Sequence, residues 1–177
     1  MKRARSLYLV GMMGAGKTTV GRLLARRLKL RFLDCDEEIE RRCGVNVPLI
    51  FEIEGEAGFR AREAQVLAEL TRLEDVVLAT GGGAVLAEEN RKALVAGGTV
   101  IDLRAWPEDL YERVRHDRNR PLLATPDPLA RLRELHAERD PLYHAVADIV
   151  VETGRQTVQA LARGLIERLA DGWKASA

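Results

Sequence analysis

The chain has 177 residues, which is enough for one domain with a single sizeable core. Hydrophobic residues make up 46% and charged residues 31%, and 28 Lys and Arg against 27 Asp and Glu give a net charge of +1. This balance excludes a general affinity for nucleic acid or acidic membranes, and no apolar run is long enough to span a bilayer. We expect a cytoplasmic monomer with one domain over residues 1–177.

Short apolar runs alternate with amphipathic stretches along the whole chain. Continuous apolar runs predict buried parallel strands, and apolar residues at helical spacing predict helices. The predicted elements, in chain order, are a strand at 7–10, a helix at 18–29, a strand at 31–33, helices at 37–42 and 56–72, a strand at 76–79, a helix at 88–96, a strand at 99–103, helices at 107–115 and 129–138, a strand at 149–151 and a helix at 157–169. This alternation predicts an α/β fold around a parallel sheet. The proline-rich stretch 117–128 has no period and predicts a mobile loop.

The first strand is followed by Gly-Met-Met-Gly-Ala-Gly-Lys-Thr at residues 11–18, which matches the pattern G-x-x-x-x-G-K-[ST]. Glycines let backbone N–H groups turn toward phosphate oxygens, Lys17 can reach the β- and γ-phosphates, and the Thr18 hydroxyl can bind Mg²⁺. The alternative is a glycine turn with a chance lysine, but the preceding strand and the following helix argue against it. The motif predicts nucleotide binding without choosing between a kinase, an ATPase and a switch. The residues expected at the nucleotide phosphates are Gly14, Ala15, Gly16, Lys17, Thr18 and Thr19.

Two acids, Asp34 and Asp36, follow the second strand. Extended residues two apart face the same way, so both carboxylates can enter one site. One can hold the water shell of Mg²⁺, and the other can accept a proton from an attacking hydroxyl. The alternative is an acidic N-cap with a solvated surface charge. P-loop proteins usually carry a metal-associated acid at another strand end, and we favour Asp34 over its competitor, Asp102.

Arg60 and Glu63 are three residues apart and share one face of the predicted helix. They can form an ordinary surface ion pair, or Arg60 can clamp a carboxylate with two hydrogen bonds while Glu63 holds its guanidinium group. The glycine triplet 81–83 follows the third strand, at the sheet edge where ligands approach the backbone in open α/β folds. Arg139 lies at a predicted helix end and is available for an anionic substrate.

A basic stretch overlaps the proline-rich loop and includes Arg113, Arg115, His116, Arg118 and Arg120. A nucleic-acid surface would carry interleaved aromatic residues, which this stretch lacks. A solvated basic helix end is the plain alternative. We favour a lid at about residues 113–125, which brings an arginine to the transferring phosphoryl group and excludes water.

Together these motifs resemble the shikimate kinase family over nearly the whole chain. The matching pieces are residues 11–19, Asp34-x-Asp36, Gly55-Glu56-x-x-Phe59-Arg60-x-x-Glu63, residues 81–83, Arg120-Pro121-Leu122-Leu123 and Arg139 in an Arg-x-Pro-Leu-Tyr stretch. The resemblance implies a three-layer α/β/α P-loop kinase fold with a lid and a five-stranded parallel sheet in the order 2-3-1-4-5. It also implies transfer of phosphate from ATP, with Mg²⁺, to the 3-hydroxyl of shikimate, on the path to chorismate and the aromatic amino acids. Residue-based reasoning alone leaves two alternatives, another small-molecule kinase such as gluconate kinase and a nucleotide-dependent switch.

The resemblance also implies a role for each matching residue on the substrate side. Asp36 would bind shikimate hydroxyls and act as the base, and Arg60 and Arg139 would hold the carboxylate. The glycine triplet, Gly81, Gly82 and Gly83, would contact the substrate, with Gly82 doing so through its backbone. The substrate-binding region would span about residues 34–62.

On the nucleotide side, the resemblance implies that Lys17 and Arg120 contact the ATP phosphates and act in catalysis. Thr18 would bind the metal, and Asp34 would hold its water shell. Adenine contacts are implied near Arg113 and in the segment 153–156, at Arg155 and Gln156.

Overall fold

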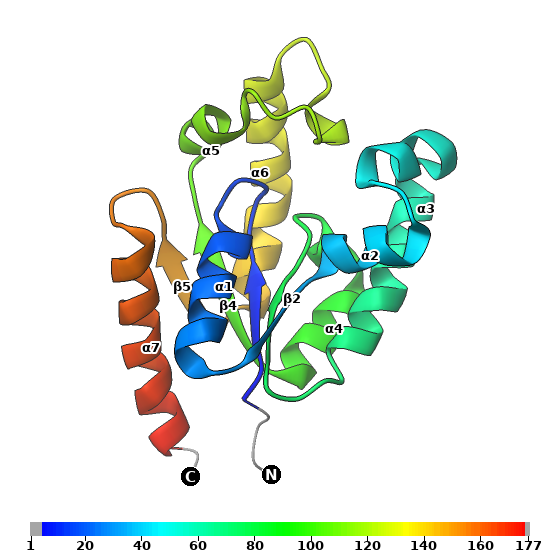
Figure 1. Cartoon of the computed structure of the whole chain (residues 1–177). Coiled ribbons are helices and arrows are strands. Elements are labelled where there is room, and N and C mark those ends of the chain that lie inside the picture. The colour runs from blue at the N-terminus through cyan, green and yellow to red at the C-terminus, as the bar shows by residue number, and fades with distance from the viewer. Residues whose placement is uncertain (1–4, 176–177) are drawn as a thin grey trace.

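A five-stranded parallel sheet runs through the centre of the protein (Figure 1). The structure is a computed structural model that describes residues 5–175, with side chains described as far as residue 172. The strands are β1 (Leu7–Val10), β2 (Arg31–Asp34), β3 (Val76–Ala79), β4 (Thr99–Arg104) and β5 (Ile149–Glu152). Every pairing is parallel, as the sequence pattern predicts, and the strand order is β2-β3-β1-β4-β5, as the family resemblance implies.

Helices cover both faces of this sheet, which completes the three layers. They are α1 (Lys17–Leu28), α2 (Cys35–Cys43), α3 (Val47–Leu70), α4 (Glu88–Gly97), α5 (Pro107–Val114), α6 (Pro128–Val146) and α7 (Val158–Ala175), with short 3-10 turns η1 (Ala84–Leu86) and η2 (Pro121–Leu123). Helices α1 and α7 pack together, while α4 packs against α3, α6 and β4. No helix in the described range is long and apolar enough to cross a membrane.

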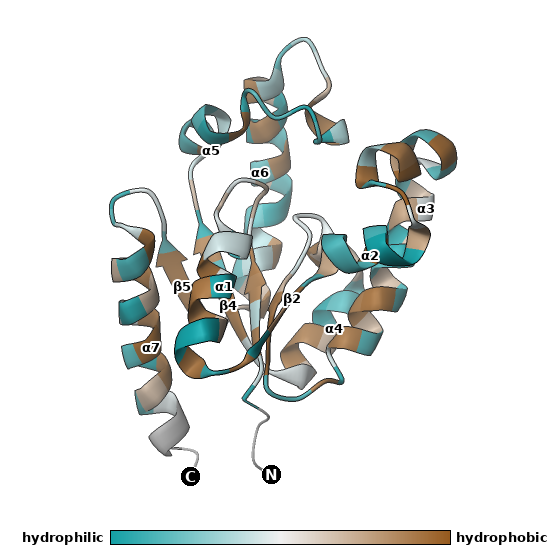
Figure 2. Ribbon diagram, viewed as in Figure 1, coloured by the Kyte–Doolittle hydropathy of each residue, from teal (hydrophilic) through white to brown (hydrophobic). Residues whose placement is uncertain are grey.

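The core lies along the central strands because their side chains are apolar on both faces. Every residue of β1 and β3 is buried, and four of the six residues of β4 are buried. The central strands are accordingly largely brown in Figure 2. This rigid centre brings the carboxyl ends of β1, β2 and β3 to one edge of the sheet, where the loops with the motifs emerge.

Helices α3 and α6 depart most from their predicted bounds, and α2 and α7 are also longer than predicted. Helix α3 begins at Val47 rather than at residue 56, because Asn46 caps it by accepting a hydrogen bond of 3.1 Å from the Leu49 N–H. Gly55, with φ 71° and ψ −179°, then interrupts the helical geometry just before the predicted start. Helix α6 continues through Pro141 to Val146, so the predicted end at residue 138 is wrong. Arg139 therefore lies inside α6 and not at a helix end.

Candidate active site

The glycine-rich loop connects β1 to α1 at the carboxyl edge of the sheet. Gly16 has φ 99° and forms the N-cap of α1, a left-handed conformation that glycine adopts without strain. At Gly11, with φ 142°, a Cβ atom would lie 2.6 Å from the carbonyl oxygen of Leu103. The loop thus curls closely against β4 and directs the positive end of α1 toward the space above it.

Lys17 is buried inside this loop. Its Nζ donates hydrogen bonds of 2.6 Å to the Gly11 carbonyl and 2.8 Å to the Met12 carbonyl. Burial lowers the pKa of Lys17 to about 8, and the negative charge of Asp36 opposes that shift. The loop therefore holds the charged end of Lys17 beside the backbone groups that suit phosphate oxygens.

Asp34 links the end of β2 to this loop. Its Oδ2 accepts a hydrogen bond of 2.8 Å from the Thr18 hydroxyl, and its Oδ1 accepts one of 3.1 Å from the Glu37 N–H. The second bond makes Asp34 the N-cap of α2, so the capping interpretation is correct and compatible with a role beside a metal. A hydroxyl and a carboxylate are hard oxygen donors of the kind that Mg²⁺ prefers.

Asp36 reaches the same cavity, although the geometry behind the prediction is wrong. It lies in the first turn of α2 and not in an extended segment. Burial, and then the charges of Glu63 and Asp34, raise the pKa of Asp36 to about 6. The competing acid, Asp102, lies buried in β4 and lines neither of the cavities described below.

A cavity of about 650 Å³ lies over the phosphate loop. Its lining contains all the residues expected at the nucleotide phosphates, together with Arg113, Arg120 and Gln156. Arg113 also donates a hydrogen bond of 3.0 Å to the Gly14 carbonyl, which ties α5 to the loop. Arg155 is exposed and does not line this cavity, whereas its neighbours Gly154 and Gln156 do.

A second cavity continues from the first and shares Asp36 and Arg120 with it. The other expected substrate residues line this second cavity: Arg60, Gly81, Gly82, Gly83 and Arg139. The structure therefore brings together the residues predicted on the acceptor side, from α2, α3, α6 and the glycine triplet.

Buried polar atoms without partners concentrate in this second cavity. Glu63 is 0% exposed, and its Oε1 accepts a hydrogen bond of 2.8 Å from Arg60 Nη1, as the spacing predicts. Its Oε2, the Oδ1 of Asp36, the Nε of Arg60, and the Nε and Nη1 of Arg139 have no hydrogen-bond partner within the described structure. Unpaired buried polar groups are costly in a folded protein, so this arrangement indicates a polar ligand.

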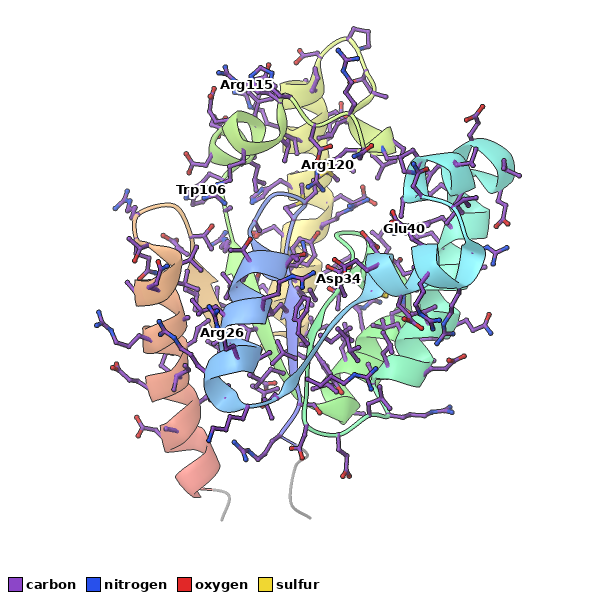
Figure 3. The ribbon with its side chains drawn as sticks, in the orientation of Figure 1. Arg26, Asp34, Glu40, Trp106, Arg115 and Arg120 are labelled. Carbon is purple, nitrogen blue, oxygen red and sulfur yellow. The ribbon has the colours of Figure 1, made fainter. Side chains whose placement is uncertain are left out.

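Arg120 lies on the segment between α5 and α6, above the phosphate loop, whereas Asp34 lies where β2 passes into α2 (Figure 3). The Nε of Arg120 is 3.1 Å from Oδ2 of Asp117. Because Arg120 lines both cavities, it lies where the nucleotide and acceptor spaces meet.

Sequence reasoning missed Tyr143, whose hydroxyl donates a hydrogen bond to the Gly82 carbonyl. The signal was its spacing, four residues after Arg139, which would place both on one helix face. Ending the helix at residue 138 hid that relationship.

Comparisons with known proteins all give the same family. The family model described as shikimate kinase matches residues 13–170. A shikimate kinase of Thiobacillus denitrificans is 60% identical over 169 residues, covering 96% of this chain and 92% of the relative. One of Ralstonia nicotianae is 62% identical over 164 residues, covering 93% and 86%. The solved shikimate kinase of Acinetobacter baumannii in complex with shikimate is 47% identical, with a TM-score of 0.93, covering 97% of this chain and 96% of that one.

Proposed function

The chain belongs to the shikimate kinase family, and we propose that it transfers the γ-phosphate of ATP to the 3-hydroxyl of shikimate where its two cavities meet. The observation that carries the proposal is the set of unpartnered, buried polar atoms on Asp36, Arg60, Glu63 and Arg139. They offer two cations for a carboxylate and an acid for hydroxyl groups. A switch without an acceptor would need none of these groups in a desolvated cavity.

On the acceptor side, Arg60 and Arg139 bind the substrate carboxylate, with Glu63 holding the Arg60 guanidinium in position. Charge-assisted pairs of this kind are strong and directional. Asp36 binds the hydroxyl that will attack and accepts its proton as the bond to phosphorus forms. A pKa of about 6, caused mainly by burial, leaves Asp36 ionised at neutral pH. It also makes Asp36 a stronger base than an ordinary aspartate, which helps it to accept a proton.

On the nucleotide side, the loop backbone and Lys17 bind the β- and γ-phosphates. Lys17 exchanges its two carbonyl acceptors for phosphate oxygens, which need the same donor. Mg²⁺, when bound, neutralises phosphate charge, and the Thr18 hydroxyl and the Asp34 carboxylate are the groups suited to hold it or its water. Arg113 and Gln156 line the same cavity and would contact the nucleoside.

Arg120 adds a positive charge at the junction of the cavities. We propose that the segment at about residues 113–125 closes as a lid, so that Arg120 contacts the transferring group and water leaves the site. Arg120 also forms an ion pair with Asp117 of the same segment, with 3.1 Å between its Nε and Oδ2 of Asp117. All five strands join one sheet, which supports a single domain, and we propose a cytoplasmic monomer.

A coupled assay of ADP release tests the function with shikimate, gluconate or no acceptor. Shikimate alone should support rapid turnover, and equal rates with all three would contradict the proposal. Asp36→Asn should lower kcat by roughly 10²-fold or more while changing the KM for ATP little. Asp75→Asn is the matched control, because Asp75 is exposed, is not part of either cavity and has φ 56°, a conformation that asparagine tolerates.

A further inference from the structure

The hydroxyl of Tyr143 donates a hydrogen bond to the carbonyl oxygen of Gly82, and we propose that Tyr143 is a positioning residue for the substrate carboxylate. Tyr143 is 2% exposed and lies on α6, four residues after Arg139. Side chains at this spacing lie on the same helix face. Helix α6 therefore presents both a guanidinium group and a tyrosine hydroxyl to the glycine triplet. The inference rests on the proposed function, because it concerns the same substrate.

The hydrogen bond fixes the peptide unit between Gly82 and Gly83. In a trans peptide the carbonyl and the N–H point in opposite directions, so the Gly83 N–H points away from Tyr143. That N–H has no hydrogen-bond acceptor among the described residues, and Gly83 lines the acceptor cavity. Tyr143 thus holds a free backbone donor in one orientation, and glycines on both sides would otherwise let the peptide rotate.

Arg139 and Gly82 are packed against each other beside this bond. A Cβ atom on Gly82 would lie 3.5 Å from Arg139 Nη1 and 3.3 Å from the backbone nitrogen of Met13. Since Tyr143 holds the Gly82 carbonyl, Gly82 forms a fixed surface beside the Arg139 guanidinium group, whose Nε and Nη1 have no hydrogen-bond partner within the described structure. The hydroxyl of Tyr143 therefore fixes the position of the Gly83 N–H relative to the Arg139 guanidinium group. These are the two groups that bind the carboxylate in this proposal.

The Tyr143 hydroxyl keeps its proton and so remains a donor. Burial raises its pKa above the ordinary range, and the neighbouring charge of Arg139 opposes this only in part. The sulfur of Met12, 3.6 Å away, is the other acceptor near this hydroxyl and is a much weaker one than a carbonyl.

The chain contains a matched control for the loss of such a hydroxyl. Tyr8 in β1 is 0% exposed, and its hydroxyl donates a hydrogen bond of 3.1 Å to the Thr71 carbonyl. Thr71 lies just after α3, and neither Tyr8 nor Thr71 lines the nucleotide or acceptor cavity. Tyr8→Phe and Tyr143→Phe therefore each remove a hydrogen bond from a buried tyrosine to a backbone carbonyl, one away from the site and one beside it.

The test compares these two variants with the wild type and with Arg139→Lys. Tyr143→Phe should raise the KM for shikimate about tenfold, which corresponds to about 1.4 kcal/mol, and leave the KM for ATP unchanged. The rise should shrink for an acceptor whose carboxylate is replaced by a neutral amide. Tyr8→Phe should lower the thermal unfolding temperature and change neither KM.

Three outcomes would overturn the inference: an unchanged KM for shikimate in Tyr143→Phe, an equal rise for the acid and the amide, or the same rise in Tyr8→Phe. Each is distinct from failure of the proposed function, in which wild-type protein would not turn over shikimate at all. If Arg139→Lys raises the KM while Tyr143→Phe does not, the carboxylate clamp stands and only the role of Tyr143 is wrong.

Discussion

The Thr18 hydroxyl donates a hydrogen bond of 2.8 Å to Oδ2 of Asp34, which joins the start of α1 to the end of β2. One residue belongs to the phosphate loop and the other caps α2, so two separate chain segments contribute adjacent oxygen atoms. This adjacency distinguishes Asp34 from the competing acid, Asp102, which lines neither cavity.

Asp34→Asn should therefore raise the Mg²⁺ concentration needed for half-maximal turnover by about tenfold or more, as the loss of groups around a metal commonly does. Asparagine is also a good N-cap, so α2 should remain stable. Magnesium titrations at saturating ATP and shikimate measure the effect. Asp102→Asn is the comparison and should leave the titration unchanged; a larger shift for Asp102→Asn than for Asp34→Asn would reverse the assignment.

Arg60→Lys should raise the KM for shikimate by about tenfold, because lysine cannot make the two-pronged contact with a carboxylate. Arg62→Lys is the control on the same helix, since Arg62 makes a comparable pair with Glu54 at 2.6 Å but lines neither cavity. Steady-state kinetics with shikimate and its amide separate the two effects. If Arg60→Lys raises the KM equally for shikimate and for its amide, Arg60 stabilises the fold and does not bind the substrate carboxylate.

Arg120→Ala should lower kcat by about 10²-fold with little change in the KM for shikimate, because its charge meets the phosphoryl group mainly in the transition state. Arg118→Ala, an exposed arginine in the same segment, should retain normal turnover. Limited proteolysis provides a second measurement. Cleavage within residues 113–125 should slow when an ATP analogue and shikimate are both bound, and equal cleavage together with normal turnover of Arg120→Ala would remove the basis for a lid.

The Asp102 side chain should contribute less to the free energy of unfolding at neutral pH than at acid pH. Burial, and then the charge of Asp140, raise the pKa of Asp102 from 3.8 to about 6, while Arg104, His144 and Lys17 act in the opposite direction. The folded state binds the proton more tightly than the unfolded state does. The contribution to stability is therefore present below about pH 4 and is lost as the pH rises through about 6.

Asp102→Asn removes this titration while preserving the shape of the side chain. The free energy of unfolding of the variant, relative to wild type, should rise by about 2 to 3 kcal/mol between pH 4 and pH 7.5. Urea denaturation at both pH values measures this difference, and Asp75→Asn corrects for a general effect of losing a carboxylate. If the free energy of unfolding of Asp102→Asn relative to wild type is the same at both pH values, the pKa of Asp102 is not raised in the folded protein.

The local structures around the candidate site that the sequence predicts correctly depend on local geometry. The phosphate loop is specified by glycines at fixed spacing between an apolar strand and a helix. The pair of Arg60 and Glu63 follows from helical spacing alone. The strand order was implied only by the family resemblance, since periodicity does not show which strands become neighbours.

The parts that the sequence does not predict depend on tertiary packing. Proline ordinarily ends a helix, yet α6 continues through Pro141, beyond the predicted end at residue 138. The burial of Tyr143 and Val146 stabilises the last two turns and outweighs the missing backbone donor. Asp36 was likewise assigned to an extended segment because the start of α2 depends on Asp34 acting as its cap.

The contact between Gly83 and Arg60 limits how this site can evolve. Gly83 has an ordinary φ of −98°, so its backbone would accept any residue. A Cβ atom there would nevertheless overlap the volume that the guanidinium group of Arg60 occupies. A lineage that gained a side chain at position 83 would have to move or lose Arg60 as well. The two positions should therefore vary together in descendants of this enzyme, and a change at either one alone should be removed by selection.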